Sequence, residues 1–204
     1  YVDRKLFIHN LGHACCAYFA AAEHPEMVYI WQAAEHPLIA EAARRAMWES
    51  GRALMVAYPE EFNEENMREH IEDLLRRFRN RALGDTIYRV GRDVPRKLGR
   101  DDRIIGAMLF DLNHSVDPHL TAYVAAAAMR FRGTDEHGEM YEPDKRFAEE
   151  IWPRGIDFVL AEVCGLDRSQ PLDARVWDMV MAANRHAAPL WERGDSVLAE
   201  LMRR

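Results

Sequence analysis

Apolar residues recur at spacings of three and four along most of the chain, which is the period of a helix that buries one face. The first candidate helix covers residues 5–22 and the second covers residues 38–58. A third follows Asn63, whose side chain is of the type that caps helix N-termini. The apolar positions of the three are, in order, Leu6, Ile8, Ala14, Ala17, Tyr18 and Ala21; Leu38, Ile39, Ala42, Ala46, Ala53 and Val56; and Met67, Ile71, Leu74, Leu75 and Phe78.

The same period continues in the second half of the sequence. Asp101 or Asp102 is placed to cap a helix that carries Ile104, Ile105, Met108, Leu109 and Leu112. Further helices fit residues 119–131, 145–164, 172–190 and 195–203. No stretch alternates apolar and polar residues with the two-residue period of a strand. The pattern therefore predicts an all-α fold, with a single domain over residues 1–204 in which several helices share one core.

Two segments interrupt the helical pattern and are predicted to be loops. Residues 79–100 contain glycines at positions 84, 91 and 99 and a proline at 95, which break helices. This segment is basic, whereas residues 132–144 read as an exposed acidic loop. The basic residues of the first segment are Arg79, Arg81, Arg89, Arg92, Arg96, Lys97 and Arg100, against only Asp85 and Asp93.

Composition narrows the class of protein. The 204 residues are 49% hydrophobic and 30% charged, which is typical of a globular domain with a substantial core. The net charge of −7 disfavours general binding to nucleic acid. Three cysteines, two of them adjacent, form no disulfide framework and favour a reducing cytoplasm. No apolar run approaches the length of a membrane span, and we expect no membrane partner. The chain starts with Tyr, which suggests that it was cut from a longer protein.

Polar side chains interrupt the first candidate helix in a way that an ordinary amphipathic helix does not require. At about 100° per residue, His9 lies about 40° from Lys5, His13 about 80° and Asn10 about 140°, so all four share one side. Gly12 lies beside Lys5 and leaves the backbone bare, which suggests that something approaches closely there. A desolvated lysine can act as a general base, an amide can donate to an oxyanion, and an imidazole can orient hydroxyls.

Other interpretations of these residues remain open. Polar residues on a helix are most often simply solvated. His9 and His13, four residues apart, could also bind a metal, although no HExxH motif and no third ligand at a familiar spacing accompany them.

The spacing K-x4-N-x2-H, formed by Lys5, Asn10 and His13 within RKLFIHNLGHACCAY, resembles the signature of the polyol-specific long-chain dehydrogenases, the mannitol dehydrogenase family. The stretch FRNRALGDTIYRVGRDVPRKLGRDDRI is similar to the mannitol-1-phosphate 5-dehydrogenases of that family, and AAAAMRFRG and LAEVCGLD also match. The resemblance extends from Arg4 to about Asp167.

The resemblance implies a two-domain enzyme, in which an N-terminal Rossmann domain binds NAD and an all-helical C-terminal domain binds substrate. This chain has no G-x-G-x-x-G motif and no βαβ pattern, so it resembles the C-terminal domain alone. By this likeness Lys5 is the general base, Asn10 polarises the carbonyl and His13 positions the substrate. No metal is implied. The isolated domain is expected to be inactive, with its active site facing the missing Rossmann domain.

The resemblance also implies substrate contacts from the basic segment. Arg89 and Lys97 hold the places of an arginine and a lysine that reach substrate hydroxyls, and His119 is implied near the same pocket. Arg92 and Arg96 are additional cations, and the planar fork of arginine suits a phosphate group. We therefore expect Lys5 and Arg89 to share one pocket, and some of the four cations to bind a sugar phosphate. Solvated surface charge is the alternative, chiefly for Arg92 and Arg96.

The implied reaction converts mannitol 1-phosphate and NAD to fructose 6-phosphate and NADH. A close alternative is the same chemistry on an unphosphorylated polyol or a hexuronate. A stand-alone module that binds a sugar phosphate without catalysis is a second alternative, and a helical interaction domain without a ligand is a third. Retention of Lys5, Asn10 and His13 together favours the enzyme.

Overall fold

The computed structural model describes residues 2–203, and within this part the chain is helical and has no strand. A single antiparallel bridge joins Tyr29 to Thr86. The all-α prediction is confirmed. The α-helices are α1 (Val2–Arg4), α2 (Leu11–Glu23), α3 (Ile30–Glu35), α4 (Pro37–Ala57), α5 (Glu64–Phe78), α6 (Ile87–Gly91), α7 (Val94–Lys97), α8 (Ile105–Asn113), α9 (His119–Met129), α10 (Glu142–Arg146), α11 (Ile156–Phe158), α12 (Pro171–Glu192) and α13 (Val197–Leu201).

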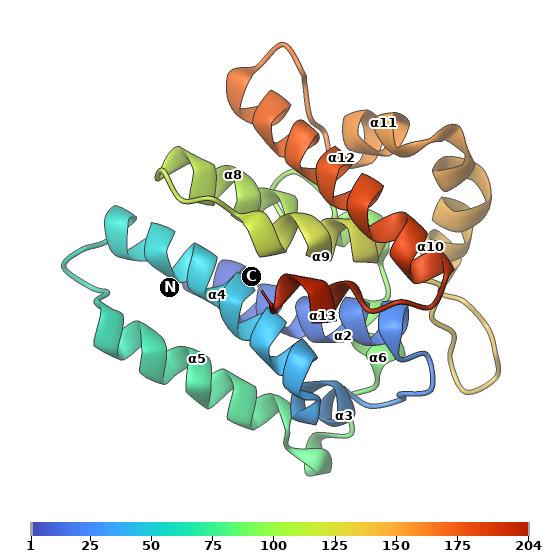
Figure 1. Cartoon of the computed structure of the whole chain (residues 1–204), viewed down its shortest axis with the longest axis horizontal. Coiled ribbons are helices and arrows are strands. Elements are labelled where there is room, and N and C mark those ends of the chain that lie inside the picture. Colours follow the sequence, from blue (N-terminus) through green and yellow to red (C-terminus); the bar gives the residue numbers. More distant parts are fainter. Residues whose placement is uncertain (1, 204) are drawn as a thin grey trace.

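The longer helices pack as successive layers around α2. Helix α4 lies beside α2, α5 covers the outer side of α4, and α8 and α9 lie on the opposite side (Figure 1). Helix α12 forms the outermost layer over α8 and α9, and the short α6 packs against α2. Helix α2 is therefore the central element, and every residue from Leu11 to Ala20 except His13 is buried.

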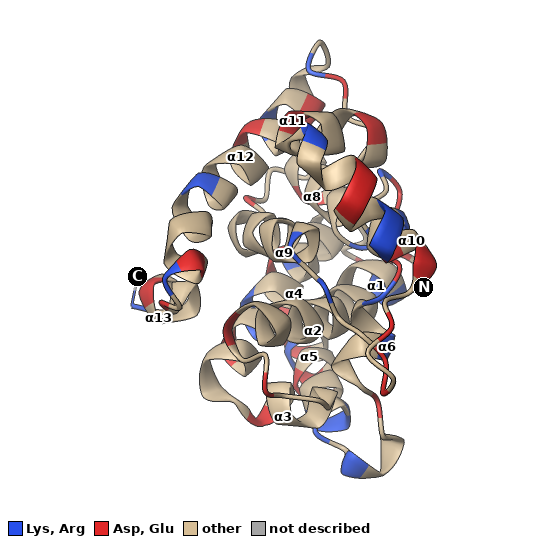
Figure 2. Cartoon of the chain, turned by 90° about the vertical axis from the view of Figure 1, so that its right-hand side faces the viewer, with Lys and Arg blue, Asp and Glu red and all other residues tan. Residues whose placement is uncertain are grey.

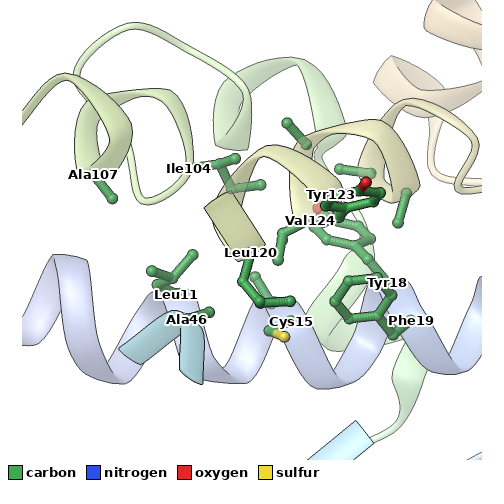
Figure 3. Packing of buried hydrophobic residues seen from close by; sticks show 14 of the residues in the cluster. Leu11, Cys15, Tyr18, Phe19, Ala46, Ile104, Ala107, Leu120, Tyr123 and Val124 are labelled. Atoms are coloured by element: carbon green, nitrogen blue, oxygen red, sulfur yellow. The ribbon is translucent and has the colours of Figure 1, made fainter. Parts of the chain in front are cut away.

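Apolar side chains of α2 and α9 form the core between these two helices, each of which is buried on nearly all sides. Leu11, Cys15 and Tyr18 of α2 face Leu120 and Val124 of α9 (Figure 3). All five are at most 5% exposed, so their burial is a main source of stability.

Gly12 has a packing role rather than the ligand role that the sequence suggested. A Cβ at this position would lie 2.4 Å from Sδ of Met47 on α4. The group that approaches the bare backbone is thus a neighbouring helix, and the glycine lets α2 and α4 come close together.

Several predicted helices are confirmed with small shifts at their ends. Helix α4 matches the predicted residues 38–58, α9 matches 119–131, α12 matches 172–190, and α13 falls within 195–203. Asn63 caps α5 as predicted, since its side chain accepts a hydrogen bond from the backbone N–H of Asn66, and the side-chain oxygen of Asn66 accepts one from the backbone N–H of Asn63.

The opening helix contains a feature that its sequence pattern did not reveal. Residues 2–23 are continuously helical, but Lys5–Asn10 form a π-helical turn, η1, between α1 and α2. The wider turn changes the angular register, so a wheel drawn at 100° per residue does not describe Lys5 to His13. Such turns occur frequently at functional sites.

Two predictions in the second half are wrong. Residues 145–164 do not form one helix: Pro153 and Gly155, which has a φ of +95°, divide them into short helical pieces. Neither Asp101 nor Asp102 caps α8, because Ile104 occupies the N-cap position and no side chain caps the helix there. The Asp102 carboxylate instead accepts from the backbone N–H of Arg103.

The two predicted loops are partly helical or partly buried. Residues 79–100 contain α6 and α7, and α3, which the sequence pattern did not predict, packs nearby. The 132–144 segment is largely exposed, except that Asp144 is 1% exposed. Its carboxylate accepts from the backbone N–H groups of Asp93 and Val94, 2.9 and 2.7 Å away, and so anchors the start of α7.

Charged residues of both signs are interspersed along the helices (Figure 2). Among residues 2–203 no helix has the combination of length and apolar character that crossing a membrane requires.

Candidate functional site

A cleft of about 330 Å³ opens where the start of α2 meets α3, the end of α5 and the segment that follows it. It combines aromatic, amide, imidazole and charged side chains, the mixture typical of a small-molecule site. The lining residues are His9, Asn10, His13, Ile30, Trp31, Arg77, Phe78, Asn80, Leu83 and Asp85. Two residues of the predicted site, Asn10 and His13, are therefore in one cleft.

The two histidines of the cleft stack on the ring of Phe78. The His13 ring is 4.7 Å from that ring and inclined by 6°, and the His9 ring is 5.8 Å from it. Stacking of this kind fixes the orientation of both imidazoles. Burial lowers the pKa of His13 to about 4, although the charge of Asp85 opposes the shift. Burial, together with the charge of Lys5, also lowers the pKa of His9. Near neutral pH His13 is thus an uncharged hydrogen-bonding group.

Asp85 and Arg89 form an ion pair at one edge of the cleft. The Arg89 guanidinium donates to Oδ1 of Asp85, and Oδ2 lies 3.8 Å from Nε2 of His13. Arg89 itself is 64% exposed and does not line the cleft. The prediction that Arg89 contacts substrate thus stays a prediction, and in the structure its charge is engaged by Asp85.

Lys5 lies one turn before the cleft, in η1, and is exposed. Its charge contributes to the lowered pKa of His9, but Lys5 is not part of the lining. His9 and Asp85 line the cleft, but their neighbours Lys5 and Arg89 do not, so the prediction that these two share one pocket stays a prediction.

The remaining cations of the basic segment are engaged within the fold. Arg96 pairs with Asp93 and Asp102 and is 54% exposed, while Arg92 lies over the rings of Tyr88 and Tyr141. These pairings indicate that both arginines are bound locally.

Lys97 is buried rather than displayed on the surface, with 5% exposure. Its ammonium donates to the backbone carbonyls of Val90 and Arg92 at the C-terminal end of α6. Burial, helped by the charges of Arg103 and Arg96, lowers the pKa of Lys97 to about 8.

The structure does not bring His119 to the cleft. It is exposed at the start of α9, where its ring meets Tyr123 edge to face at 5.3 Å. Tyr123 in turn bonds His186 of α12, so this cluster belongs to the α9–α12 layer.

Sequence reasoning did not assign five polar or aromatic residues of the lining to the site: Trp31, Arg77, Phe78, Asn80 and Asp85. Trp31 lies on the unpredicted α3, and Arg77 belongs to an ordinary amphipathic helix. Asp85 did carry a signal, as one of two acids in a basic segment.

No cluster of three or more His, Cys, Asp and Glu side chains suited to a metal ion occurs within residues 2–203. The three cysteines are free and buried.

The cleft thus combines aromatic walls with amides, imidazoles and a carboxylate, a lining typical of small-molecule sites. The chain belongs to the mannitol dehydrogenase C-terminal domain family, whose sequence model matches residues 1–159.

Curated relatives agree with this assignment. The chain is 34% identical over 172 residues to a mannitol-1-phosphate 5-dehydrogenase of Bacillus licheniformis, which covers 84% of this chain and 43% of that protein. The enzyme of the same name from Bacillus subtilis is 33% identical over 174 residues, with 85% and 43% covered. That of Podospora anserina is 31% identical over 180 residues, with 88% and 43% covered. The chain therefore spans less than half the length of these relatives.

Proposed function

We propose that this chain is the substrate-binding and catalytic domain of an NAD-dependent polyol-phosphate dehydrogenase that interconverts mannitol 1-phosphate and fructose 6-phosphate. The observation that carries the proposal is the position of Asn10 and His13 in one cleft beside the exposed Lys5. The names of the curated relatives support the substrate.

In the proposed mechanism Lys5 takes the proton of the reacting hydroxyl through Nζ, as a general base. Asn10 donates from its amide to the oxygen that becomes the carbonyl, and the uncharged His13 orders a neighbouring hydroxyl. Removal of water from around an amine favours its neutral form, which accepts protons. Closure of an adjoining domain over the exposed Lys5 would remove that water.

NAD, when bound, accepts the hydride. The described residues contain no strand and so no doubly wound sheet of the kind that binds a dinucleotide, and we assign no NAD-binding residue to this chain. An N-terminal Rossmann domain of the same polypeptide would hold it, which fits the share of the relatives that this chain leaves uncovered. The isolated chain is accordingly expected to be inactive.

Oxidation of an unphosphorylated polyol is the second candidate, and one observation favours it. Arg89, Arg96 and Lys97 all have partners within the fold, which weakens their case as phosphate ligands. Arg77 is the cation that lines the cleft, although it also pairs with Asp73.

The test uses the full-length parent polypeptide and follows NADH formation with mannitol 1-phosphate and with mannitol. We expect the phosphate ester to be preferred, and Lys5→Ala to lower kcat by about 10²- to 10⁴-fold because general-base catalysis is lost. Lys145→Ala, at an exposed lysine of α10, is the matched control and should keep full activity. Activity on mannitol alone would favour the second candidate. No activity on either substrate would refute the proposed function, and an active Lys5→Ala variant would refute the role of Lys5.

A further inference from the structure

Asp85 is fixed at the edge of the cleft by its own backbone. Its carbonyl accepts a hydrogen bond of 2.9 Å from the N–H of Ile30, the first residue of α3. The adjacent Thr86 forms the antiparallel bridge with Tyr29, and the N–H of Ile87 donates to Val28 at 2.8 Å. The backbone is therefore tied to the start of α3 at Asp85 and at the two residues that follow it, which holds the Asp85 carboxylate in place at the edge of the cleft.

The Asp85 carboxylate has only part of its accepting capacity in use. Arg89 donates to Oδ1, while Oδ2 is 3.8 Å from Nε2 of His13, too far for a direct hydrogen bond. An ionised carboxylate offers about four lone-pair positions on its two oxygens. Because the side chain is 16% exposed and lines the cleft, the unused positions are available to a molecule bound there.

The other polar groups of the cleft make this acceptor distinctive. Asp85 is the one acid among the described residues that line the cleft. Asn80 already uses its side-chain oxygen to accept from the N–H of Ala82 at 3.0 Å, while its amide nitrogen offers two donors. A bound polyol presents hydroxyl hydrogens that need acceptors, and a hydrogen bond to an ionised acceptor is about twice as strong as a neutral one.

We propose that Asp85 is a specificity-determining residue that accepts hydrogen bonds from the hydroxyls of an extended polyol. Arg89 then also acts as a positioning residue, because its ion pair holds the Asp85 carboxylate. The proposal rests on the proposed function, since it names a further contact of the same site. The Asp85 charge also repels anions, so the ionised end of a phosphorylated substrate must lie elsewhere, and Arg77 is the cation on the cleft wall.

The experiment compares Asp85→Asn with Asp93→Asn in the full-length parent. Asp93 is a matched control because it also pairs with a following arginine, Arg96, but lies outside the cleft. Loss of a charge-assisted hydrogen bond predicts a rise in KM of about 10- to 100-fold for Asp85→Asn, with a smaller change in kcat. Asp93→Asn should change KM less than about twofold. Equal KM values for the two variants would overturn the proposal.

A second measurement separates substrate contact from a structural effect. A set of monodeoxy polyols, each lacking one hydroxyl, is assayed with the unmodified parent and with Asp85→Asn. The analogue that lacks the contacted hydroxyl should lose affinity in the unmodified protein and lose little more in the variant, because the two changes remove one interaction. Additive losses for every analogue would show that Asp85 acts only on the structure.

Two further arms keep the result interpretable. If Asp85→Asn does not fold, Asp85→Glu replaces it: the longer side chain keeps the charge and an arginine partner but moves the carboxylate, so KM should still rise. If the unmodified parent oxidises neither substrate, the proposed function fails, and calorimetric titration with mannitol tests Asp85 separately. Binding that weakens in Asp85→Asn but not in Asp93→Asn would then support its role, whereas no measurable binding of mannitol by the unmodified parent would overturn it.

Discussion

The cleft and the α6–α7 segment, residues 87–97, are both rich in polar and charged residues, but the partners of these side chains differ between the two regions. In the cleft, the imidazoles of His9 and His13 are held by stacking on Phe78, and both residues line the open space. In residues 92–97 the polar groups bind one another or the backbone: Arg96 pairs with two aspartates, and Lys97 donates to two carbonyls.

This difference shows that the number of cations in a segment does not locate a ligand site. A ligand competes with whatever partners a side chain already has, so only groups with unused hydrogen-bonding capacity gain much by binding it. The basic segment has only two acids, and each pairs with one of its arginines: Asp85 with Arg89, and Asp93 with Arg96. Asp85 is more informative, because it connects the two regions: it pairs with Arg89 of the α6–α7 segment and lies beside His13 in the cleft.

The largest effect on stability should come from Asp144, which anchors the α6–α7 segment. Asp144→Ala leaves the N–H groups of the half-buried Asp93 and the buried Val94 without an acceptor, and the free energy of unfolding should fall by about 2–4 kcal/mol. Asp144→Asn keeps one acceptor oxygen and should cost less. Urea unfolding of both variants measures which one loses more free energy of unfolding. When the same substitutions are made in the full-length parent, its KM should hardly change. A KM that rises in proportion to the loss of stability would show that the two regions are not separate.

The next effect concerns the cleft and depends on pH. Folding lowers the pKa of His13 from 6.5 to about 4, so between these values the unfolded chain binds a proton that the folded chain does not. The contribution of His13 to stability is complete above about pH 6.5 and is lost as the pH falls toward 4, by at most about 3 kcal/mol.

Urea unfolding at several pH values checks this slope. His13→Gln should remove it, because glutamine does not titrate, while other groups contribute equally to both proteins. An identical pH dependence in the two proteins would contradict the burial of a neutral imidazole.

The helical fold was predictable from sequence because apolar spacing reports burial directly. Helices α4, α5 and α12 carry clear apolar stripes, whereas α9 is buried on all sides from Leu120 to Met129. The failures have local causes. Apolar periodicity spans a break such as Gly155, whose φ of +95° interrupts residues that otherwise fit one helix. A π-helical turn such as η1 is equally invisible to a fixed period of 3.6 residues.

The site was only partly predictable. Asn10 and His13 come from one helix and were found through their spacing, whereas Trp31, Phe78 and Asp85 are brought to them by tertiary packing. The burial of Lys97 could not be foreseen either, because its partners are backbone carbonyls that every sequence has. Gly12 was singled out correctly, but its close neighbour is Met47 rather than a ligand.

The smallest effect is expected for Arg96, and it tests the comparison most directly. Its pairs with Asp93 and Asp102 lie near the surface, where water screens the charges and side-chain entropy offsets the gain. Arg96→Gln should therefore change unfolding free energy by less than about 0.5 kcal/mol and leave the KM for mannitol 1-phosphate within about twofold. Arg77→Gln, at the cation on the cleft wall, is the matched comparison and should raise that KM further. A larger rise in this KM for Arg96→Gln than for Arg77→Gln would show that the α6–α7 segment, and not the cleft wall, binds the phosphate.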